Sequence, residues 1–294
     1  MNDCAIIVPI HNMQGRLSNF KSWLNSAIEL NFLVVIVNDE STDETSSELE
    51  EFLKKYCDQR NLIYICGTYG SPGAARNAGL EKISTKWVVF VDSDDKPNLA
   101  AVLEMINSSK FGSNLLIGQY FVEDLSTGAR RVQGNGTNPM LQFAKNPGIW
   151  RLAFERQLID KVQFCHSLMG EDQVFIAEVL LNNPRINFYE KPVYTYVVGQ
   201  QSQATKSPNA LNQLPISIRQ LISAASKSSL RFGWVVEIMI ARQTITALKR
   251  GKISTKLDAC LLFSLHALNF NPKVKIIQFA GIYNLVRKKR VPDV

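Results

Sequence analysis

The sequence of 294 residues lacks the usual marks of secreted and membrane-spanning chains. Its five cysteines are an odd number and form no Cys-x-x-Cys pair, so we expect neither a disulfide framework nor a zinc site. The longest purely apolar runs, such as residues 88–91, fall far short of the ~20 residues that a membrane-spanning helix needs. The first ten residues show neither a basic segment nor a small-residue cleavage site, so we expect no signal peptide and a cytoplasmic location.

Two common nucleotide-binding motifs are also missing. No Gly-x-Gly-x-x-Gly stretch occurs, which argues against a dinucleotide site. Gly251 and Lys252 are followed by Ile253 and lack the upstream glycine of a phosphate-binding loop. With 46% hydrophobic and 20% charged residues, the chain has enough apolar side chains for a sizeable core, and global disorder is excluded.

The net charge of +7 is spread unevenly along the chain. Residues 1–205 contain 18 basic and 23 acidic residues, whereas residues 206–294 contain 15 basic and 3 acidic residues. Such asymmetry indicates two functional parts. We therefore expect a catalytic domain over 1–205 and a basic helical region over 206–294 that could meet a polyanion or an anionic membrane face.

Apolar runs alternate with helix-like stretches through the first part of the chain. This order predicts an α/β fold in which a mostly parallel central sheet carries helices on both faces. Beyond residue 110 the pattern predicts a hairpin, then a helix after Gly170, two further strands, and helices from Asn209 onward. The first four strands are expected at 5–9, 33–37, 61–65 and 87–91, and their helices at 16–30, 41–56, 72–82 and 99–106.

Polar residues follow each of these strands. In an open α/β sheet, ligands bind at the carboxyl ends of the strands, so these side chains are expected at one edge. Asp92 and Asp94 lie two residues apart after a buried strand, and hard carboxylate oxygens suit Mg²⁺ or Mn²⁺. The alternative is an ordinary turn in which Asp94 or Asp95 caps the next helix.

Five short motifs together resemble the inverting family 2 glycosyltransferases of GT-A fold, of the bacterial surface-polysaccharide type. The resemblance covers residues 3–205 and leaves the final third unexplained. The motifs are Val8-Pro9-Ile10-His11-Asn12, Val37-Asn38-Asp39-Glu40-Ser41-Thr42-Asp43, Gly73-Ala74-Ala75-Arg76-Asn77-Ala78-Gly79, Val91-Asp92-Ser93-Asp94-Asp95 and Gly170-Glu171-Asp172.

The resemblance implies a role for each matched residue. Asp94, with Asp92, would hold Mn²⁺ or Mg²⁺, and Asp172 would be the catalytic base, with Glu171 as its nearest rival. The residues that bind the nucleotide would be Pro9, His11, Asn12, Asp39, Arg76, Asp92 and Ser93. Three of the assigned residues also have an ordinary structural alternative: a turn for Asp39, an ion pair for Arg76 and a favourable helix N-terminus for Asp172.

Acceptor and phosphate contacts are less specific. Trp150 is either a platform for a sugar or acceptor, or a core aromatic residue. Ser202 and Thr205 lie where the family carries a Ser-rich phosphate loop, although Val197 and Val198 replace its usual arginine region.

The resemblance implies transfer of a hexose-type sugar, with inversion, from a nucleotide-sugar donor to a hydroxyl of a glycan or lipid-linked saccharide acceptor. The resemblance to this family favours UDP as the nucleotide of the donor. One alternative is a metal-dependent sugar-phosphate nucleotidyltransferase, but residues 12–16 are a meagre match to the Gly-rich basic loop of that class. Another is a catalytically inactive, membrane-associated nucleotide-binding scaffold, against which the intact aspartates argue.

The tail over residues 273–290 has apolar residues at helical spacing and ends in four basic residues. It predicts an interfacial helix on an anionic membrane surface, with a solvated helix or a subunit interface as alternatives. Nucleic acid is not expected as a partner, because no nucleic-acid-binding motif accompanies the charge. The sugar, the acceptor, the linkage and the oligomeric state are left open.

Overall fold

The computed structural model describes residues 3–134, 136–198, 207–228 and 231–268. The chain divides into two compact units, each described by itself. The boundary expected at residue 205 from charge and composition stays a prediction. Unit 1 comprises Met1–Pro139, Gly148–His166 and Pro184–Gln201, and unit 2 comprises Met140–Pro147, Ser167–Asn183 and Ser202–Val294.

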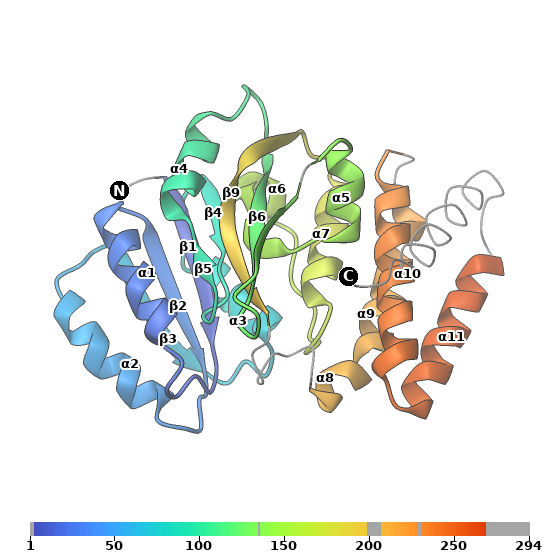
Figure 1. Cartoon of the computed structure of the whole chain (residues 1–294), viewed down its shortest axis with the longest axis horizontal. Coiled ribbons are helices and arrows are strands. Elements are labelled where there is room, and N and C mark those ends of the chain that lie inside the picture. Colours follow the sequence, from blue (N-terminus) through green and yellow to red (C-terminus); the bar gives the residue numbers. More distant parts are fainter. Residues whose placement is uncertain (1–2, 135, 199–206, 229–230, 269–294) are drawn as a thin grey trace. The chain divides into compact units, whose positions relative to one another are not determined.

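Unit 1 is built on a nine-stranded sheet in the order β3-β2-β1-β4-β8-β6-β9-β5, with β7 paired to β6 (Figure 1). The four strands expected from apolar runs are parallel neighbours. Three of them are almost wholly buried, as expected for strands covered on both faces. They are β1 (Cys4–Ile10), β2 (Leu33–Asp39), β3 (Leu62–Gly67) and β4 (Trp87–Phe90).

Helices cover both faces of this sheet. Ile6 and Val8 share a buried cluster with side chains of α1 and α4, whereas Ile7 and Val37 face α3. This alternation follows from the two-residue period of a strand. The helices are α1 (Ser18–Glu29), α2 (Thr45–Leu53) with the short helix η1 (Lys54–Tyr56), α3 (Pro72–Leu80) and α4 (Leu99–Asn107).

The second half of the sheet is mixed. The predicted hairpin is confirmed, since β6 and β7 pair antiparallel. The strands expected at 186–189 and 193–198 form one strand, β9, which runs parallel to β6 with register shifts. β8 runs antiparallel to both β4 and β6, so the parallel order stops there. The α/β prediction is confirmed. These strands are β5 (Lys96–Pro97), β6 (Leu115–Asp124), β7 (Arg130–Gln133), β8 (Leu152–Glu155) and β9 (Ile186–Val198), with the short helices η2 (Ile149–Arg151) and α6 (Arg156–Ile159) beside β8.

Unit 2 is helical over its described residues, as expected from Asn209 onward. Leu214 and Ile218 of α9 pack with Ala247 of α10 and Ala259 of α11. None of the helices in the described part of the chain is both long and apolar enough to cross a membrane. The helices are α5 (Pro139–Lys145), α7 (Glu171–Leu181), α8 (Pro208–Asn212), α9 (Leu214–Lys227), α10 (Gly233–Arg250) and α11 (Ile253–Leu268).

Candidate functional site

The loops that follow β1 and β2 are joined by hydrogen bonds at the carboxyl edge of the sheet. The Asn12 N–H donates to Ser41 Oγ at 3.1 Å, and Asn12 Oδ1 accepts from the Thr42 N–H at 2.8 Å. Ser41 Oγ in turn donates to Asn38 Oδ1 at 2.7 Å. The spacing of Ser41 and Glu44 predicts a capping box at the start of α2. This prediction is wrong, because α2 begins at Thr45 and the Ser41 hydroxyl contacts Asn12 and Asn38 instead.

Asp39, the last residue of β2, ties the next loop to this edge. Its Oδ1 accepts from the backbone N–H groups of Tyr69 and Gly70 at 2.6 and 2.8 Å, and its backbone oxygen accepts from His11 Nδ1 at 2.6 Å. Gly70 has a φ of +73°, which a residue with a side chain rarely adopts. Two donors on Oδ1 leave acceptor capacity at Oδ2 for a ligand N–H. Pro9 lies in β1 opposite Val37 and is half-buried.

Helix α3 carries Arg76 to the end of β4. Ser71 caps the helix by accepting from the Ala74 N–H at 3.2 Å, and Pro72 occupies its first turn, as expected. Arg76 is buried, donates from Nη2 to Asp92 Oδ1 at 2.8 Å, and lies 5.4 Å from the centre of the Phe164 ring. The structure therefore brings Arg76 to Asp92. The sequence gives no signal for Phe164.

The turn after β4 holds three carboxylates. Asp95 and Ser93 are buried, and Asp92 and Asp94 are half-buried. Burial and the charge of Asp92 raise the pKa of Asp94, while burial and the charges of Asp92 and Asp94 raise the pKa of Asp95 well above its ordinary value. The carboxylates of this turn repel one another, and together they attract a cation.

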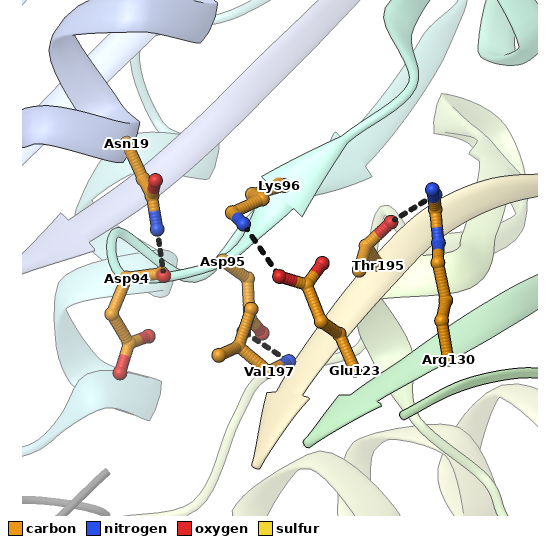
Figure 2. A network of polar contacts seen from close by, with 8 residues as sticks. All are labelled: Asn19, Asp94, Asp95, Lys96, Glu123, Arg130, Thr195 and Val197. Carbon is orange, nitrogen blue, oxygen red and sulfur yellow. Dashed lines mark hydrogen bonds and ion pairs between the residues drawn. The ribbon is translucent and has the colours of Figure 1, made fainter. Parts of the chain in front are cut away.

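The interpretation of Asp94 or Asp95 as a helix cap is wrong. Asn98 caps α4 instead, since its side chain accepts from the Ala101 N–H at 3.2 Å. Asp95 Oδ1 accepts from the Val197 N–H of β9 at 3.0 Å, and the backbone oxygen of Asp94 accepts from Asn19 Nδ2 of α1 at 2.9 Å (Figure 2). The sequence shows Asp95 beside the predicted pair, but nothing local indicates its partner in β9.

Further polar contacts surround this turn from the neighbouring strands. Lys96 Nζ donates to Glu123 Oε1 of β6 at 2.9 Å, a contact drawn in Figure 2. Arg130 Nη2 of β7 donates to Thr195 Oγ1 of β9 at 3.4 Å. Residues from α1, β5, β6, β7 and β9 therefore form the surroundings of the turn.

The donor set fits a hard divalent cation that shares its coordination with a ligand. Among the described residues, no group of three or more His, Cys, Asp and Glu side chains is arranged to hold a metal ion unaided. Mg²⁺ is usually bound through one or two carboxylates together with substrate phosphates. Asp92 and Asp94, two carboxylates in one self-repelling turn, meet that requirement.

Trp150 lies in an aromatic cluster of unit 1 and is half-buried. Its ring stacks on Tyr194 and Tyr196 with centroid distances of 4.6 and 5.4 Å, and meets Tyr120 edge to face at 4.7 Å. These contacts account for Trp150 as a packing residue. Its proposed part in acceptor binding stays a prediction.

The predicted base belongs to unit 2. Glu171 and Asp172 form the first turn of α7, directly after Gly170, whose φ is +82°. Asp172 Oδ1 accepts from the Gln173 N–H at 2.8 Å, and Glu171 is buried. The positive φ of residue 170 favours glycine, and a Cβ there would also lie 3.1 Å from Ser217 Cβ, a tight contact.

Two predictions lie outside the described residues. Ser202 and Thr205, the candidates for a phosphate loop, fall within 199–206. The basic tail over 273–290 falls within 269–294.

Comparison with known proteins shows the family of this chain. The model of the family described as Glycosyl transferase family 2 matches residues 5–168, which is more than half of the chain. A poly(ribitol-phosphate) beta-glucosyltransferase of Bacillus spizizenii is 27% identical over 68% of this chain and 33% of its own length. The TarP poly(ribitol-phosphate) beta-N-acetylglucosaminyltransferase of Staphylococcus aureus is 26% identical over 78% of this chain and 73% of its own length.

Solved structures share the fold. The structure of S. aureus TarS 1–349 in complex with UDP-GlcNAc has a TM-score of 0.71 and 19% identity, covering 99% of this chain and 92% of that one. A mannosyltransferase of Pyrobaculum calidifontis, in complex with GDP-Man and Mn²⁺, has a TM-score of 0.54 and 15% identity, covering 98% and 86%. The chain spans about a third of the length of the first curated relatives, at 33% and 31%. By the match over residues 5–168, the chain belongs to glycosyl transferase family 2.

Proposed function

We propose that this chain transfers a hexose-type sugar, with inversion, from a nucleotide-sugar donor to a hydroxyl of a glycan or glycolipid precursor, and that the donor carries UDP. One observation carries the proposal. Asp39 at the end of β2 and the carboxylates of Asp92 and Asp94 after β4 lie at one sheet edge, and α3 connects them by placing Arg76 on Asp92. Membership in a glycosyl transferase family supports the reaction class.

The donor would be held by groups of different chemistry along this edge. Asp39 would accept from a ring N–H of the base, beside His11 and Asn12, and Asp92 would face the ribose. Asp94, with Asp92, would hold Mn²⁺ or Mg²⁺. When bound, the cation offsets the negative charge that develops on the diphosphate as the sugar leaves.

The chain's own acidic groups would supply the proton transfer. An acceptor hydroxyl is a poor nucleophile at neutral pH, and a carboxylate that takes its proton in the transition state contributes ~10²–10⁴-fold. We assign this role to Asp172, with Glu171 as the rival. The hydroxyl oxygen bonds to the anomeric carbon as the bond to the diphosphate oxygen breaks, and attack opposite that oxygen inverts the centre.

The acceptor class is proposed from the relatives. Several of them are named as poly(ribitol-phosphate) glycosyltransferases. We therefore propose that the accepting hydroxyl belongs to a bacterial surface polymer or its lipid-linked precursor. The basic tail over 273–290 would bring the chain to the anionic membrane where such precursors are built, which vesicle co-sedimentation with and without residues 273–294 would test.

A thermal-shift panel with UDP, GDP and CDP, each with and without Mn²⁺, tests the donor site. A ligand that binds only the folded state raises the free energy of unfolding, by ~2.7 kcal/mol at one hundred times its dissociation constant. We expect UDP with Mn²⁺ to raise Tm most. The absence of a metal-dependent shift with any of the nucleotides would contradict the proposal.

A donor screen separates a transferase from an inactive nucleotide-binding scaffold. Nucleotide sugars are incubated with the protein and Mn²⁺, and release of the nucleoside diphosphate is followed. Slow donor hydrolysis is expected from a transferase that lacks its acceptor, whereas nucleotide binding without turnover of any donor would favour the scaffold.

A further inference from the structure

Tyr194 of β9 occupies an unusual place beside the carboxylate turn. Its side chain is fully buried, with 1% of the residue exposed. Its hydroxyl accepts from the backbone N–H of Asp92 at 3.1 Å. The hydroxyl therefore holds the first residue of the turn that runs from Asp92 to Asp95.

A second contact ties the other end of the turn to the same strand. Asp95 Oδ1 accepts from the Val197 N–H at 3.0 Å, three residues beyond Tyr194 in β9. Strand β9 therefore contacts the turn at both ends, at Asp92 through the Tyr194 hydroxyl and at Asp95 through the Val197 N–H. Two contacts fix the turn against the strand more firmly than a single contact does.

The position of Tyr194 is itself fixed by contacts on other sides. Its backbone lies opposite Pro97 where β5 pairs with β9, directly after the turn. Its ring stacks on Trp150 at 4.6 Å, with 20° between the ring planes. The hydroxyl is therefore presented to the turn by a side chain that has little freedom to move.

We propose that Tyr194 and Asp95 are positioning residues, which hold the turn so that Asp92 and Asp94 face a divalent cation together. The inference rests on the proposed function, because it concerns the cation that would accompany the donor. Three carboxylates within four residues repel one another, and a turn free to relax would spread them apart. The hydrogen bond from the Asp92 N–H to the Tyr194 hydroxyl opposes that relaxation.

The variant Tyr194→Phe tests the proposal, since it keeps the stacked ring and removes only the hydroxyl. Tyr120→Phe is the matched control. Tyr120 is also buried and also contacts Trp150, but its hydroxyl donates to Gln133 at 2.9 Å. Calorimetric titration of the full chain with UDP at a series of Mn²⁺ concentrations gives the half-saturating Mn²⁺ concentration of each protein.

We expect Tyr194→Phe to raise the half-saturating Mn²⁺ roughly ten-fold, the size typical of losing a partner of a metal ligand, while UDP binding without metal changes by less than about two-fold. Tyr120→Phe is expected to match the wild type. Equal Mn²⁺ requirements in the two variants would overturn the proposal. If Tyr194→Phe does not fold, Asp95→Ala is measured instead, because it removes the oxygen that accepts from the Val197 N–H, and we expect the same direction of change.

Amide hydrogen exchange separates this proposal from the proposed function. The peptide over residues 90–96 contains the Asp92 N–H that donates to Tyr194. Faster exchange there in Tyr194→Phe but not in Tyr120→Phe is expected whether or not UDP binds. Unchanged exchange would overturn the positioning role, whereas a wild type that binds no nucleotide with Mn²⁺ would overturn the proposed function.

Discussion

Arg76 donates from Nη2 to Oδ1 of Asp92 at 2.8 Å, although the two residues come from different elements, helix α3 and the turn after β4. Only 5% of the Arg76 side chain is exposed, against 32% of the Asp92 side chain. The same helix begins beside the loop that Asp39 holds at Tyr69 and Gly70. Arg76 thus links the region proposed to bind the nucleotide base to the region proposed to bind the cation. It is therefore a structural link as well as a residue of the proposed donor site.

Replacing Arg76 by lysine is expected to weaken UDP binding in the presence of Mn²⁺ by roughly ten-fold, because lysine keeps the charge but loses the planar guanidinium that lies over Phe164. Calorimetry gives the dissociation constant. The control is Arg156→Lys, since Arg156 contacts Asp160, the residue directly after helix α6, in a partly exposed pair. Equal affinities in both variants would remove Arg76 from the site.

Asp94→Asn is expected to stabilise the metal-free protein and to abolish its Mn²⁺-dependent thermal shift. Burial and the charge of Asp92 disfavour the ionised Asp94 side chain, so a neutral residue of the same shape relieves repulsion. A gain of ~1 kcal/mol raises Tm by ~2–4 °C in domains of about 150–250 residues, so we expect Tm to rise by at most ~4 °C. A loss of Tm together with an intact Mn²⁺ effect would refute the assignment.

The difference in Tm between Asp94→Asn and the wild type is expected to depend on pH. The pKa of Asp94 is raised in the folded protein, so the folded state binds this proton more tightly than the unfolded chain does. The stability that this proton contributes is complete below the unfolded value of ~3.9 and is lost as pH rises through the folded pKa. The Tm advantage of Asp94→Asn should therefore grow from pH 4 to pH 7 in metal-free buffer, as thermal melts would show.

Gly79→Ala is expected to destabilise unit 1 by ~1–3 kcal/mol, against the helix propensity that alone would favour alanine by ~1 kcal/mol. A Cβ there would lie 2.6 Å from Ile7 Cγ2 and 3.3 Å from Val37 Cγ2, so α3 would have to move away from the sheet. Urea unfolding measures the change. A stabilised variant would show that α3 does not pack this closely on β1.

Local patterns in the sequence predict the first half of unit 1 well. The apolar run 33–37 predicts β2, and the positions of Asp39, Asp92 and Asp94 at the carboxyl ends of their strands follow once the sheet is taken as parallel. What local patterns miss depends on pairings between distant residues. The Asp95 contact with Val197 spans 102 positions, and β8, which lies antiparallel between β4 and β6, is not predicted as a strand at all. Ser41 shows the opposite error, because its plausible local capping role is replaced by a contact with the loop after β1.

Asp172→Asn is expected to keep UDP binding and lose sugar transfer by ~10²–10⁴-fold if Asp172 is the base. Its carboxylate lies in the first turn of α7 and accepts from the Gln173 N–H, which the asparagine side-chain oxygen can also do. Glu171→Gln is the matched control, because Glu171 is also a carboxylate in the first turn of α7 but is more buried than Asp172. Near-normal turnover of Asp172→Asn, with loss in Glu171→Gln, would transfer the role to Glu171.

Gly170→Ala tests how the start of α7 is held. Alanine would meet two obstacles there: a φ of +82°, and a Cβ that would lie 2.8 Å from Gln243 Nε2 and 3.1 Å from Ser217 Oγ. Gly128→Ala is the control, since Gly128 also has a positive φ, +67°, but open space around it. The backbone strain alone costs roughly 1 kcal/mol, and the added clash should make Gly170→Ala distinctly less stable than Gly128→Ala in urea unfolding.

Gly170→Ala also separates donor binding from proton transfer in the proposed reaction. Gly170 belongs to unit 2, as do Glu171 and Asp172, whereas the residues proposed to bind the donor belong to unit 1. At a temperature where Gly170→Ala remains folded, UDP binding should match that of the wild type while transfer falls, because the first turn of α7 carries the proposed base. Loss of UDP binding in parallel with transfer would contradict that assignment, since the substitution touches none of the residues proposed to hold the nucleotide.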